Sequence, residues 1–374
     1  MEQDIAIELL DRFAERTGLG LRGAPRRYLW TDAFAVVNWL ELHRRTQDAR
    51  FRSLALDLVG QVHATLGRHR PDDSRKGWLS GLSDEAGAAH PTAGGLRIGK
   101  PLPERAAGDP PDERLEWDRD GQYFHYLTKW MDALARAGTL LDEPRFHAWA
   151  ADLAAATFPR FLQRSPASEP LGLAWKMSID LSRPQVAGLS PHDALDGYVT
   201  FRWLDAAGGR PALDEETAIL RGLVRGRRWG TGDPLGLGGL LLDAMRLSIL
   251  PRAAEDEFLL AAIVSGVAGG LAQFLHDGTL DQPADRRLAF RELGLAIGLQ
   301  GLHPVAAAAG GPIAALQAAR PLGEHIVEFW LDQQNRRAAA WLDHRDINEV
   351  MLATALLEAQ AGTAVLHTAR QPGQ

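Results

Sequence analysis

The chain has 374 residues, 45% hydrophobic and 24% charged, which is enough apolar material for the core of a globular protein. Its formal net charge is −7, and its 41 basic residues are dispersed among 48 acidic ones, unlike the clustered basic face that nucleic-acid binding requires. The sequence contains no cysteine, which excludes disulfides, thiolate metal sites and cysteine nucleophiles.

Helical periodicity dominates the sequence, and strand-like alternation is almost absent. The apolar faces and stop signals predict twelve helices, near residues 3–17, 31–46, 48–67, 121–138, 142–164, 192–207, 212–225, 236–249, 254–276, 288–302, 311–334 and 345–361.

The N-terminal segment, MEQDIAIELLDRFAERTG, is acidic and amphipathic, unlike a signal peptide. The most apolar stretch, residues 258–275, is interrupted by glycines and a glutamine, so we expect no membrane-spanning helix. These features favour a cytoplasmic protein with no membrane or nucleic-acid partner. The sequence does not indicate an oligomeric state.

Two kinds of helix alternate along the chain. Six of them, starting with 31–46 and ending with 345–361, begin with polar residues and continue with small and apolar ones, as expected of an inner layer. The others, such as 48–67 and 142–164, carry a charged stripe opposite an apolar one, as an outer layer should. This alternation predicts an all-α fold, an (α/α)6 barrel of six helical hairpins, as a single domain over residues 1–374. The first helix would pack outside, beside the last inner helix.

The longest connections, residues 68–120, 165–191 and 277–287, all precede inner helices. Loops of this length are usually functional or disordered. The tryptophans in them, Trp78, Trp117 and Trp175, argue against disorder. We therefore expect ordered loops on one face of the ring.

Each inner helix begins with a polar cluster, and these clusters should converge at one end of the ring. They are YLWTDAF (28–34), EWDRDGQYFHY (116–126), SPHDALDGY (190–198), TGDPLGLGG (231–239), DRRLAFRE (285–292) and WLDHRDINE (341–349). Carboxylates and arginines bind hydroxyl and anionic groups, and indoles cover the apolar faces of sugar rings. The composition therefore predicts a pocket for a small polyhydroxylated ligand.

Helix capping is the alternative explanation for the aspartates in these clusters, because caps stabilise a helix start by about 0.5–2 kcal/mol. It applies to each of Asp32, Asp120, Asp193, Asp233 and Asp346. Capping does not explain the neighbouring acids, which are Glu116 and Asp118 before Asp120, Asp196 one turn after Asp193, and Glu349 one turn after Asp346.

Three histidines are candidates for acid–base chemistry. His125 lies about one turn from Asp120, and His192 and His344 begin the third and sixth inner helices. In the loop before the third inner helix, WKMSIDLSRP (175–184) could form a hairpin arm whose Lys176, Asp180 and Arg183 contact an anionic substituent. A solvated rim segment explains that loop equally well.

Other site types find little support. GLGG at 236–239 lacks the preceding strand and following lysine of a phosphate-binding loop, so close helix packing explains it better. The spacings HExxH and GxSxG are absent, and we predict no metal and no cofactor.

The segments EWDRDGQYFHYLTKW and WLDHRDINEVMLA resemble the helix starts of the six-hairpin, (α/α)6-toroid superfamily. That superfamily includes glycoside hydrolases, unsaturated-uronide hydrolases and N-acylglucosamine 2-epimerase-like isomerases. The resemblance implies an active site in a funnel at the inner-helix N-termini.

The resemblance implies two enzymatic functions, and a third, non-catalytic function stands beside them. In a glycoside hydrolase, which we place first, Asp120 donates the proton and Asp32 or Asp193 positions or activates water. In a sugar isomerase or 2-epimerase, His192 and His344 exchange a proton beside a carbonyl. The third possibility, from another functional class, is a non-catalytic helical ring that binds a ligand or a protein partner. The remaining side chains would bind substrate; they are Trp30, Glu116, Trp117, Tyr123, His125, Trp175, Asp180, Asp196, Arg345, Asp346 and Glu349.

Overall fold

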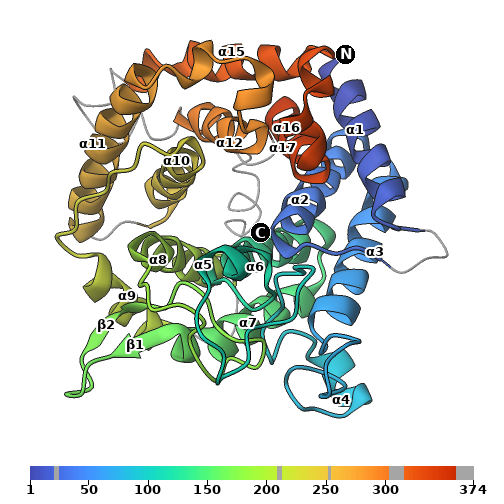
Figure 1. Ribbon diagram of the computed structural model, residues 1–374, viewed down its shortest axis with the longest axis vertical. Helices are drawn as coiled ribbons and strands as arrows, with labels where there is room; N and C mark the ends of the chain where they lie inside the picture. Colours follow the sequence, from blue (N-terminus) through green and yellow to red (C-terminus); the bar gives the residue numbers. More distant parts are fainter. Residues whose placement is uncertain (21–24, 209–212, 252–253, 303–315, 359–374) are drawn as a thin grey trace, which may run out of the picture. The chain divides into compact units, whose positions relative to one another are not determined.

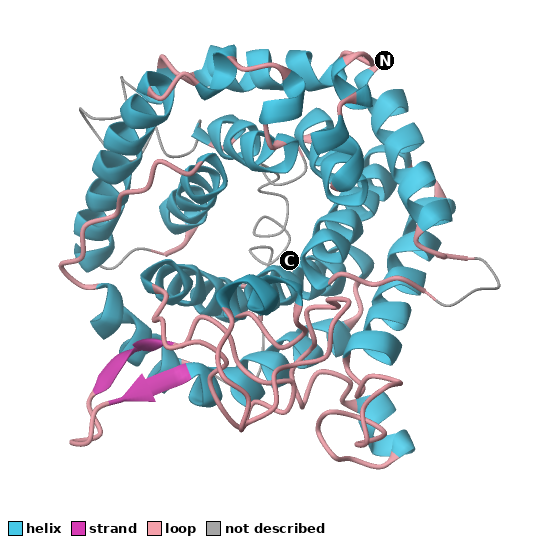
Figure 2. Ribbon diagram, viewed as in Figure 1, coloured by secondary structure: helices cyan, strands magenta, loops and turns pink. Residues whose placement is uncertain are grey.

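The computed structural model describes residues 1–20, 25–208, 213–251, 254–302 and 316–358, and these are mainly helical (Figures 1 and 2). Contacts divide the chain into two compact units. We call them the 14–224 unit and the 225–363 unit; the latter includes Met1–Phe13.

Three helical hairpins form the 14–224 unit. Its inner helices, α2 (Leu29–Thr46), α6 (Phe124–Leu141) and α8 (Pro191–Ala206), lie side by side and are buried along most of their length. Each packs against an outer helix, in turn α3 (Ala49–Leu66), α7 (Pro144–Phe161) and α9 (Asp214–Val224). The outer helices bury one face only, as amphipathic sequences should.

The 225–363 unit repeats this arrangement. Its inner helices are α10 (Pro234–Ile249), α12 (Ala289–Gln300) and α17 (Arg345–Leu357). The remaining helices are α11 (Ala254–His276), α15 (Arg320–Leu331), α16 (Ala339–Asp343), and the 3-10 turns Thr279–Asp281, Ala284–Arg286 and Asn335–Arg337. The unit also holds the start of α1 (Glu2–Arg16).

Close packing of α10 against α12 explains the glycines of the GLGG segment. A Cβ atom at Gly238 would lie 2.0 Å from the carbonyl oxygen of Gly294 on α12, whereas a Cβ atom at Gly239 would meet nothing within 4 Å. The packing explanation of this segment is confirmed.

Twelve observed helices match the twelve predicted ones, with differences at their ends. The first residues of the helix predicted at 311–334, up to residue 315, lie outside the described residues. The helix predicted at 142–164 ends at Phe161, because residues 162–164 instead form β1 (Leu162–Arg164), antiparallel to β2 (Pro170–Leu173). The helix predicted from residue 121 starts at Phe124, because Gln122 pairs with Met177 in an extended bridge.

The long loop 68–120 is ordered and contains two short helices, α4 (Asp84–Ala89) and α5 (Glu113–Asp118). The expected hairpin arm at 175–184 is also present, because Met177 bridges both Gln122 and Pro184. These loops cover the N-terminal ends of the inner helices in the 14–224 unit (Figure 2).

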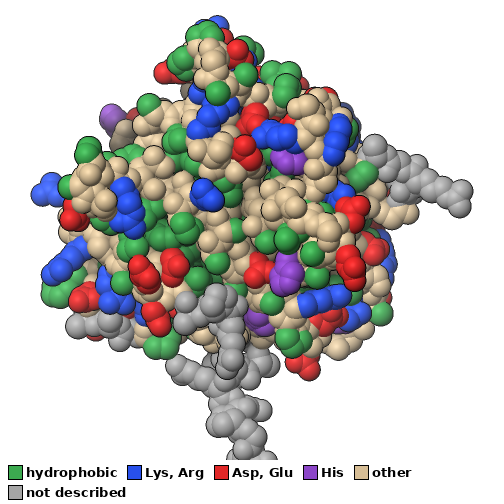
Figure 3. All heavy atoms as spheres, turned by 90° about the horizontal axis from the view of Figure 1, so that it is seen from below, with side chains coloured by type: hydrophobic (Ala, Val, Ile, Leu, Met, Phe, Trp, Pro, Cys, Tyr) green, Lys and Arg blue, Asp and Glu red, His purple; other side chains and the backbone are tan. Residues whose placement is uncertain are grey.

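On the face shown in Figure 3, acidic and basic side chains are interspersed, as their dispersal in the sequence suggested. One stretch of the described chain, Glu255–Asp281, passes the length and composition test for a membrane span, with a mean hydropathy of 2.0 over a window that is 39% buried. This differs from the expectation that no stretch would pass. Core helices of soluble proteins also meet this test.

Candidate functional site

Six aromatic side chains gather where α2, α6 and the 175–184 loop begin, and we call them the aromatic cluster: Tyr28, Trp30, Trp117, Tyr123, Tyr126 and Trp175. Trp117 and Trp175 meet edge to face at 5.2 Å between ring centroids, and Trp175 lies 5.1 Å from Tyr123. Tyr123 lies 5.1 Å from Tyr126, whose ring centroid is 6.5 Å from that of Trp30. Trp117 is 54% exposed.

The cluster also holds polar atoms. The hydroxyl groups of Tyr28 and Tyr126 share a hydrogen bond of 2.6 Å. The hydroxyl of Tyr123 is buried and has no hydrogen-bond partner within the described part of the chain. Burial raises the pKa of Tyr28 and of Tyr123, so both phenols stay protonated near neutral pH and remain hydrogen-bond donors.

His125 lies against this cluster on the first turn of α6. Its ring stacks on Tyr123 at 5.1 Å and meets the ring of Tyr126 edge-on at 4.9 Å. Its Nδ1 atom is 3.1 Å from Oδ2 of Asp193 on α8. The imidazole is 30% exposed, and among the described residues its Nε2 atom has no hydrogen-bond partner.

A second hydrogen bond fixes Asp193. Ser190 is the N-cap of α8; its hydroxyl accepts from the Asp193 backbone N–H and donates to Oδ1 of Asp193 at 2.7 Å. The Asp193 side chain is buried, and its carboxylate faces His125 through its other oxygen. Because an ionised carboxylate only accepts hydrogen bonds, Nδ1 of His125 carries the proton, and Nε2 offers a lone pair.

Asp120 has the surroundings of a structural ion pair. It is fully buried, and its Oδ2 atom lies 2.5 Å from the guanidinium of Arg97. Its Oδ1 atom accepts from the backbone N–H groups of Gly99, Lys100 and Gly121. These contacts tie loop 68–120 to the start of α6. The role of Asp120 as proton donor stays a prediction that this geometry does not favour.

Asp32 and Glu116 are also buried beside cations. Asp32 accepts from the backbone N–H of Tyr28 at 2.9 Å and lies 3.4 Å from the guanidinium of Arg27. Glu116 lies 3.0 Å from Arg105 and 3.2 Å from Nζ of Lys176, which is itself fully buried. Burial lowers the pKa of Lys176. The expected contact between Lys176 and a ligand is therefore replaced by a contact with the chain itself.

The remaining predicted residues of the 14–224 unit lie around these groups. Asp196 joins α8 to α6 through Lys129 at 2.7 Å and the Thr128 hydroxyl. Asp180 lies on the loop surface, 3.0 Å from Arg75. His192 is half-buried at the start of α8.

In the 225–363 unit, Glu349 is buried and lies 3.1 Å from Arg345 on the same helix. Asp346 is half-buried, and His344 is exposed beside Phe290 with 5.4 Å between ring centroids. His192 and His344 belong to different units, so their pairing stays a prediction.

Tyr28, Tyr126 and Ser190 belong to the site but were not singled out from the sequence, although each lies inside one of the quoted polar clusters. Within the described chain, no group of three or more histidine, aspartate or glutamate side chains is arranged to hold a metal ion.

No protein-family model matches the sequence, and no curated protein matches it. Three solved structures illustrate its structural likeness. The family 76 α-mannanase of Bacteroides thetaiotaomicron aligns with a TM-score of 0.58 and 10% identity, covering 96% of each chain. An inactive double Asp-to-Asn variant of an α-1,6-mannanase from Salegentibacter sp., in complex with α-1,6-mannotriose, gives 0.52 and 11%, covering 96% of this chain and 99% of that one.

The third is the cellobiose 2-epimerase of Spirochaeta thermophila, with a TM-score of 0.52 and 13% identity over 93% of this chain and 97% of that one. Likeness at such low identity shows the fold alone. These neighbours are six-hairpin (α/α)6 toroids, so the predicted fold class and the predicted resemblance are confirmed. The single domain over residues 1–374 stays a prediction.

Proposed function

We propose that the chain is a carbohydrate-active enzyme that transfers a proton at the carbon next to the carbonyl of a sugar, with His125 as the base. The observation that carries this proposal is the His125–Asp193 pair at the aromatic cluster, in which Nε2 of the partly exposed ring bonds to none of the described residues. This is the isomerase or epimerase alternative of the sequence analysis, with a different histidine in the central role.

In this reaction the open-chain sugar lies against the aromatic cluster, with its C2–H bond directed at Nε2 of His125. The proton passes to Nε2, and the bonding electrons move into the carbonyl group to give an enediolate. Asp193 stabilises the imidazolium that forms. A phenol of the Tyr28–Tyr126 pair is placed to donate a hydrogen bond to the carbonyl oxygen, because the Tyr126 ring meets His125 directly. Return of the proton to C1, with transfer of the O2 proton to O1, gives the ketose isomer. Delivery of a proton to the opposite face of C2 gives the epimer.

The hydrolase, first in the sequence analysis, has less support. A hydrolase needs carboxyl groups that reach the substrate, about 5–10 Å apart. Asp120 and Asp32 instead lie against Arg97 and Arg27 inside the protein. The inactive mannanase variant lost two neighbouring aspartates. Neighbouring aspartates occur in this sequence only at 72–73.

Asp72 and Asp73 also pair with arginines of the same loop. Asp72 accepts from Arg70 at 2.8 Å, and Asp73 accepts from Arg75 at 2.7 Å. Because these carboxylates bind arginines rather than facing a substrate, they favour a second candidate function, a sugar-binding protein without catalysis.

Proton transfer can be tested by incubating the chain with unlabelled mannose, glucose and cellobiose in D2O and following the H2 signal of each sugar by NMR. We expect the wild type to lose the H2 signal. We expect His125→Ala to exchange H2 at least about 100-fold more slowly. His90→Ala is the matched control, because His90 also pairs through Nδ1 with an aspartate, Asp152, at 2.8 Å, but outside the aromatic cluster.

Three other results would favour a different function or remove His125 from the mechanism. Sugar binding that quenches tryptophan fluorescence without any exchange would favour the binding protein. Hydrolysis of aryl glycosides that survives His125→Ala would return the hydrolase to first place. Equal exchange rates in His125→Ala and the wild type would remove His125 from the mechanism.

A further inference from the structure

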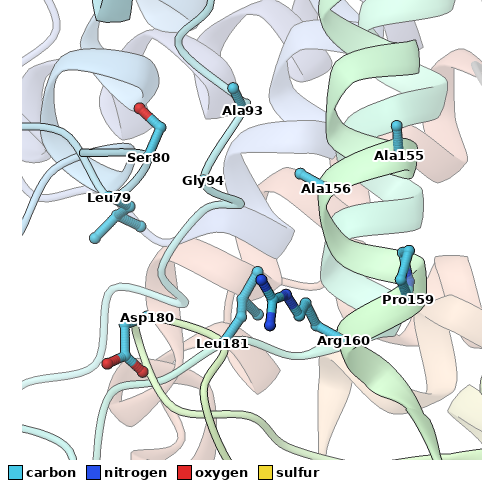
Figure 4. Close-up of a pocket in the computed structure, with 10 residues that line it drawn as sticks. All are labelled: Leu79, Ser80, Ala93, Gly94, Ala155, Ala156, Pro159, Arg160, Asp180 and Leu181. Atoms are coloured by element: carbon cyan, nitrogen blue, oxygen red, sulfur yellow. The ribbon is translucent and has the colours of Figure 1, made fainter. Parts of the chain in front are cut away.

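A hollow of about 540 Å³ lies in the 14–224 unit, and no residue of the aromatic cluster lines it. One wall is the end of α7, and the opposite wall is made by two segments of loop 68–120 and one segment of the 175–184 loop (Figure 4). Its lining residues are Leu79, Ser80, Ala93, Gly94, Ala155, Ala156, Pro159, Arg160, Asp180 and Leu181. We call it the α7 pocket. Its volume is within the range of about 300–1,000 Å³ that holds small ligands.

Ala155 and Arg160 line the pocket from α7. Pro159 lies inside the helix and has no N–H, so the Ala155 carbonyl lacks the donor that residue 159 would otherwise supply. Arg160 is exposed, and its guanidinium takes part in no ion pair or hydrogen bond with the described residues. Figure 4 shows its side chain extending from α7 toward the loop that carries Leu181.

The loop wall is fixed in place and contributes a carboxylate. Asp180 accepts from the hydroxyl groups of Ser178 and Ser182, each at 2.7 Å, and from Arg75 at 3.0 Å. Burial alone would raise the pKa of Asp180, but these contacts lower it, so the carboxylate stays ionised. Its charge is compensated by Arg75, which leaves Arg160 as the cation lining the pocket without a partner among the described residues.

The loop wall contains a residue in an unusual backbone conformation. Leu181 is buried with φ +59°, a value that a branched apolar residue rarely adopts without support from its surroundings. The side-chain amide of Gln122 supplies such support by donating to the carbonyls of Gly94 and Ile179. The pocket is therefore built from fixed segments.

We propose that the α7 pocket binds a small polyhydroxylated carboxylate, such as a sugar acid. A carboxylate pairs with the planar guanidinium of Arg160 through two parallel hydrogen bonds. Ligand hydroxyl groups donate to the Ala155 carbonyl and to Asp180, and Ser80 can both donate and accept. The carbon skeleton lies against Leu79, Ala156 and Leu181. This site does not depend on the reaction proposed for His125.

The test uses calorimetric titration of the full chain with D-glucuronate, D-glucose and L-alanine. We expect glucuronate to bind and glucose, which lacks the carboxylate, to bind at least about tenfold more weakly. Arg160→Gln should weaken glucuronate binding about tenfold or more, and Arg164→Gln, an exposed arginine three residues beyond the end of α7, should not change it.

Pro159→Ala provides a second test that keeps the fold, because alanine restores the N–H and engages the Ala155 carbonyl within the helix. We expect this variant to bind glucuronate about two- to tenfold more weakly. Binding that is unchanged in Arg160→Gln, or that is lost in His125→Ala instead, would place the ligand elsewhere and overturn the proposal. Tighter binding of alanine than of glucuronate would overturn the assigned ligand class.

Discussion

Replacing Asp120 with asparagine tests whether this carboxylate has a structural or a catalytic role. The side chain is fully buried, and one oxygen faces Arg97 while the other accepts three backbone N–H groups. Asparagine has nearly the same shape and can keep its oxygen toward the backbone groups. Its amide nitrogen then faces the guanidinium, donor against donor, and leaves a buried cation without its anion.

The expected cost follows from that arrangement. Removing one partner of a buried ion pair destabilises a protein by about 3–5 kcal/mol. Arg97 keeps its hydrogen bonds to the backbone carbonyls of Arg68 and Thr65, both at 2.7 Å, so the guanidinium stays inside the protein. For a folding unit of this size, each kcal/mol shifts the melting temperature by about 2–4 °C, which gives a decrease of about 6–20 °C.

Circular dichroism melting of the wild type, Asp120→Asn, Arg97→Met and the double variant measures this cost. We expect the double variant to lose less stability than the sum of the two single losses, by about 0.5–3 kcal/mol, because the two side chains interact directly. Hydrogen exchange at C2 of the sugar should persist in Asp120→Asn below its melting transition. A variant as stable as the wild type but inactive would show that this carboxyl group acts on substrate.

Two further predictions concern stability. Gly238→Ala should destabilise the chain by about 1–3 kcal/mol, because its Cβ atom would lie 2.0 Å from the Gly294 carbonyl oxygen. Gly239→Ala, whose Cβ atom would meet nothing within 4 Å, should instead stabilise the chain by about 0.5–1 kcal/mol. Thermal melting compares the two variants, and equal effects would contradict the close packing of α10 on α12. Burial lowers the pKa of His63 from 6.5 to about 3, so the unfolded chain binds a proton there that the folded chain does not. The contribution of His63 to the free energy of unfolding is therefore fully present above about pH 6.5. It decreases by about 1.4 kcal/mol for each unit by which the pH falls from 6.5 toward 3. Urea unfolding between pH 4.5 and 7.5 should show a shallower slope for His63→Gln, which can still accept from Trp130, and an unchanged slope would refute the assignment.

The helices could be predicted because each inner or outer helix carries its own pattern of apolar residues, and that pattern depends on neighbours within a turn or two. Helix ends depend on more distant residues. The start of α6 is delayed to Phe124 because Gln122 pairs with Met177, and no local signal contains that pairing. The end of α7 at Phe161 likewise reflects the pairing of Leu162 with Leu173.

The same distinction applies to the candidate site. The polar starts of α2, α6 and α8 do lie together within the 14–224 unit, as the position of inner-helix N-termini predicted. The partner of each acid could not be predicted, because a carboxylate beside an arginine and one beside a histidine look alike in sequence. Asp120 meets Arg97 and Asp193 meets His125, and these contacts join residues 23 and 68 positions apart.

These partners decide which side chains remain able to react. A carboxylate that is satisfied by a guanidinium and three backbone N–H groups has little capacity left for a substrate, and breaking such a set costs several kcal/mol. His125 uses one ring nitrogen to bind its carboxylate and keeps the other at a partly exposed position, so the same kind of pairing that occupies Asp120 leaves the imidazole available. The chemistry of this site is therefore expected to follow the histidine, since among the paired groups described it combines a fixed orientation with an unoccupied acceptor.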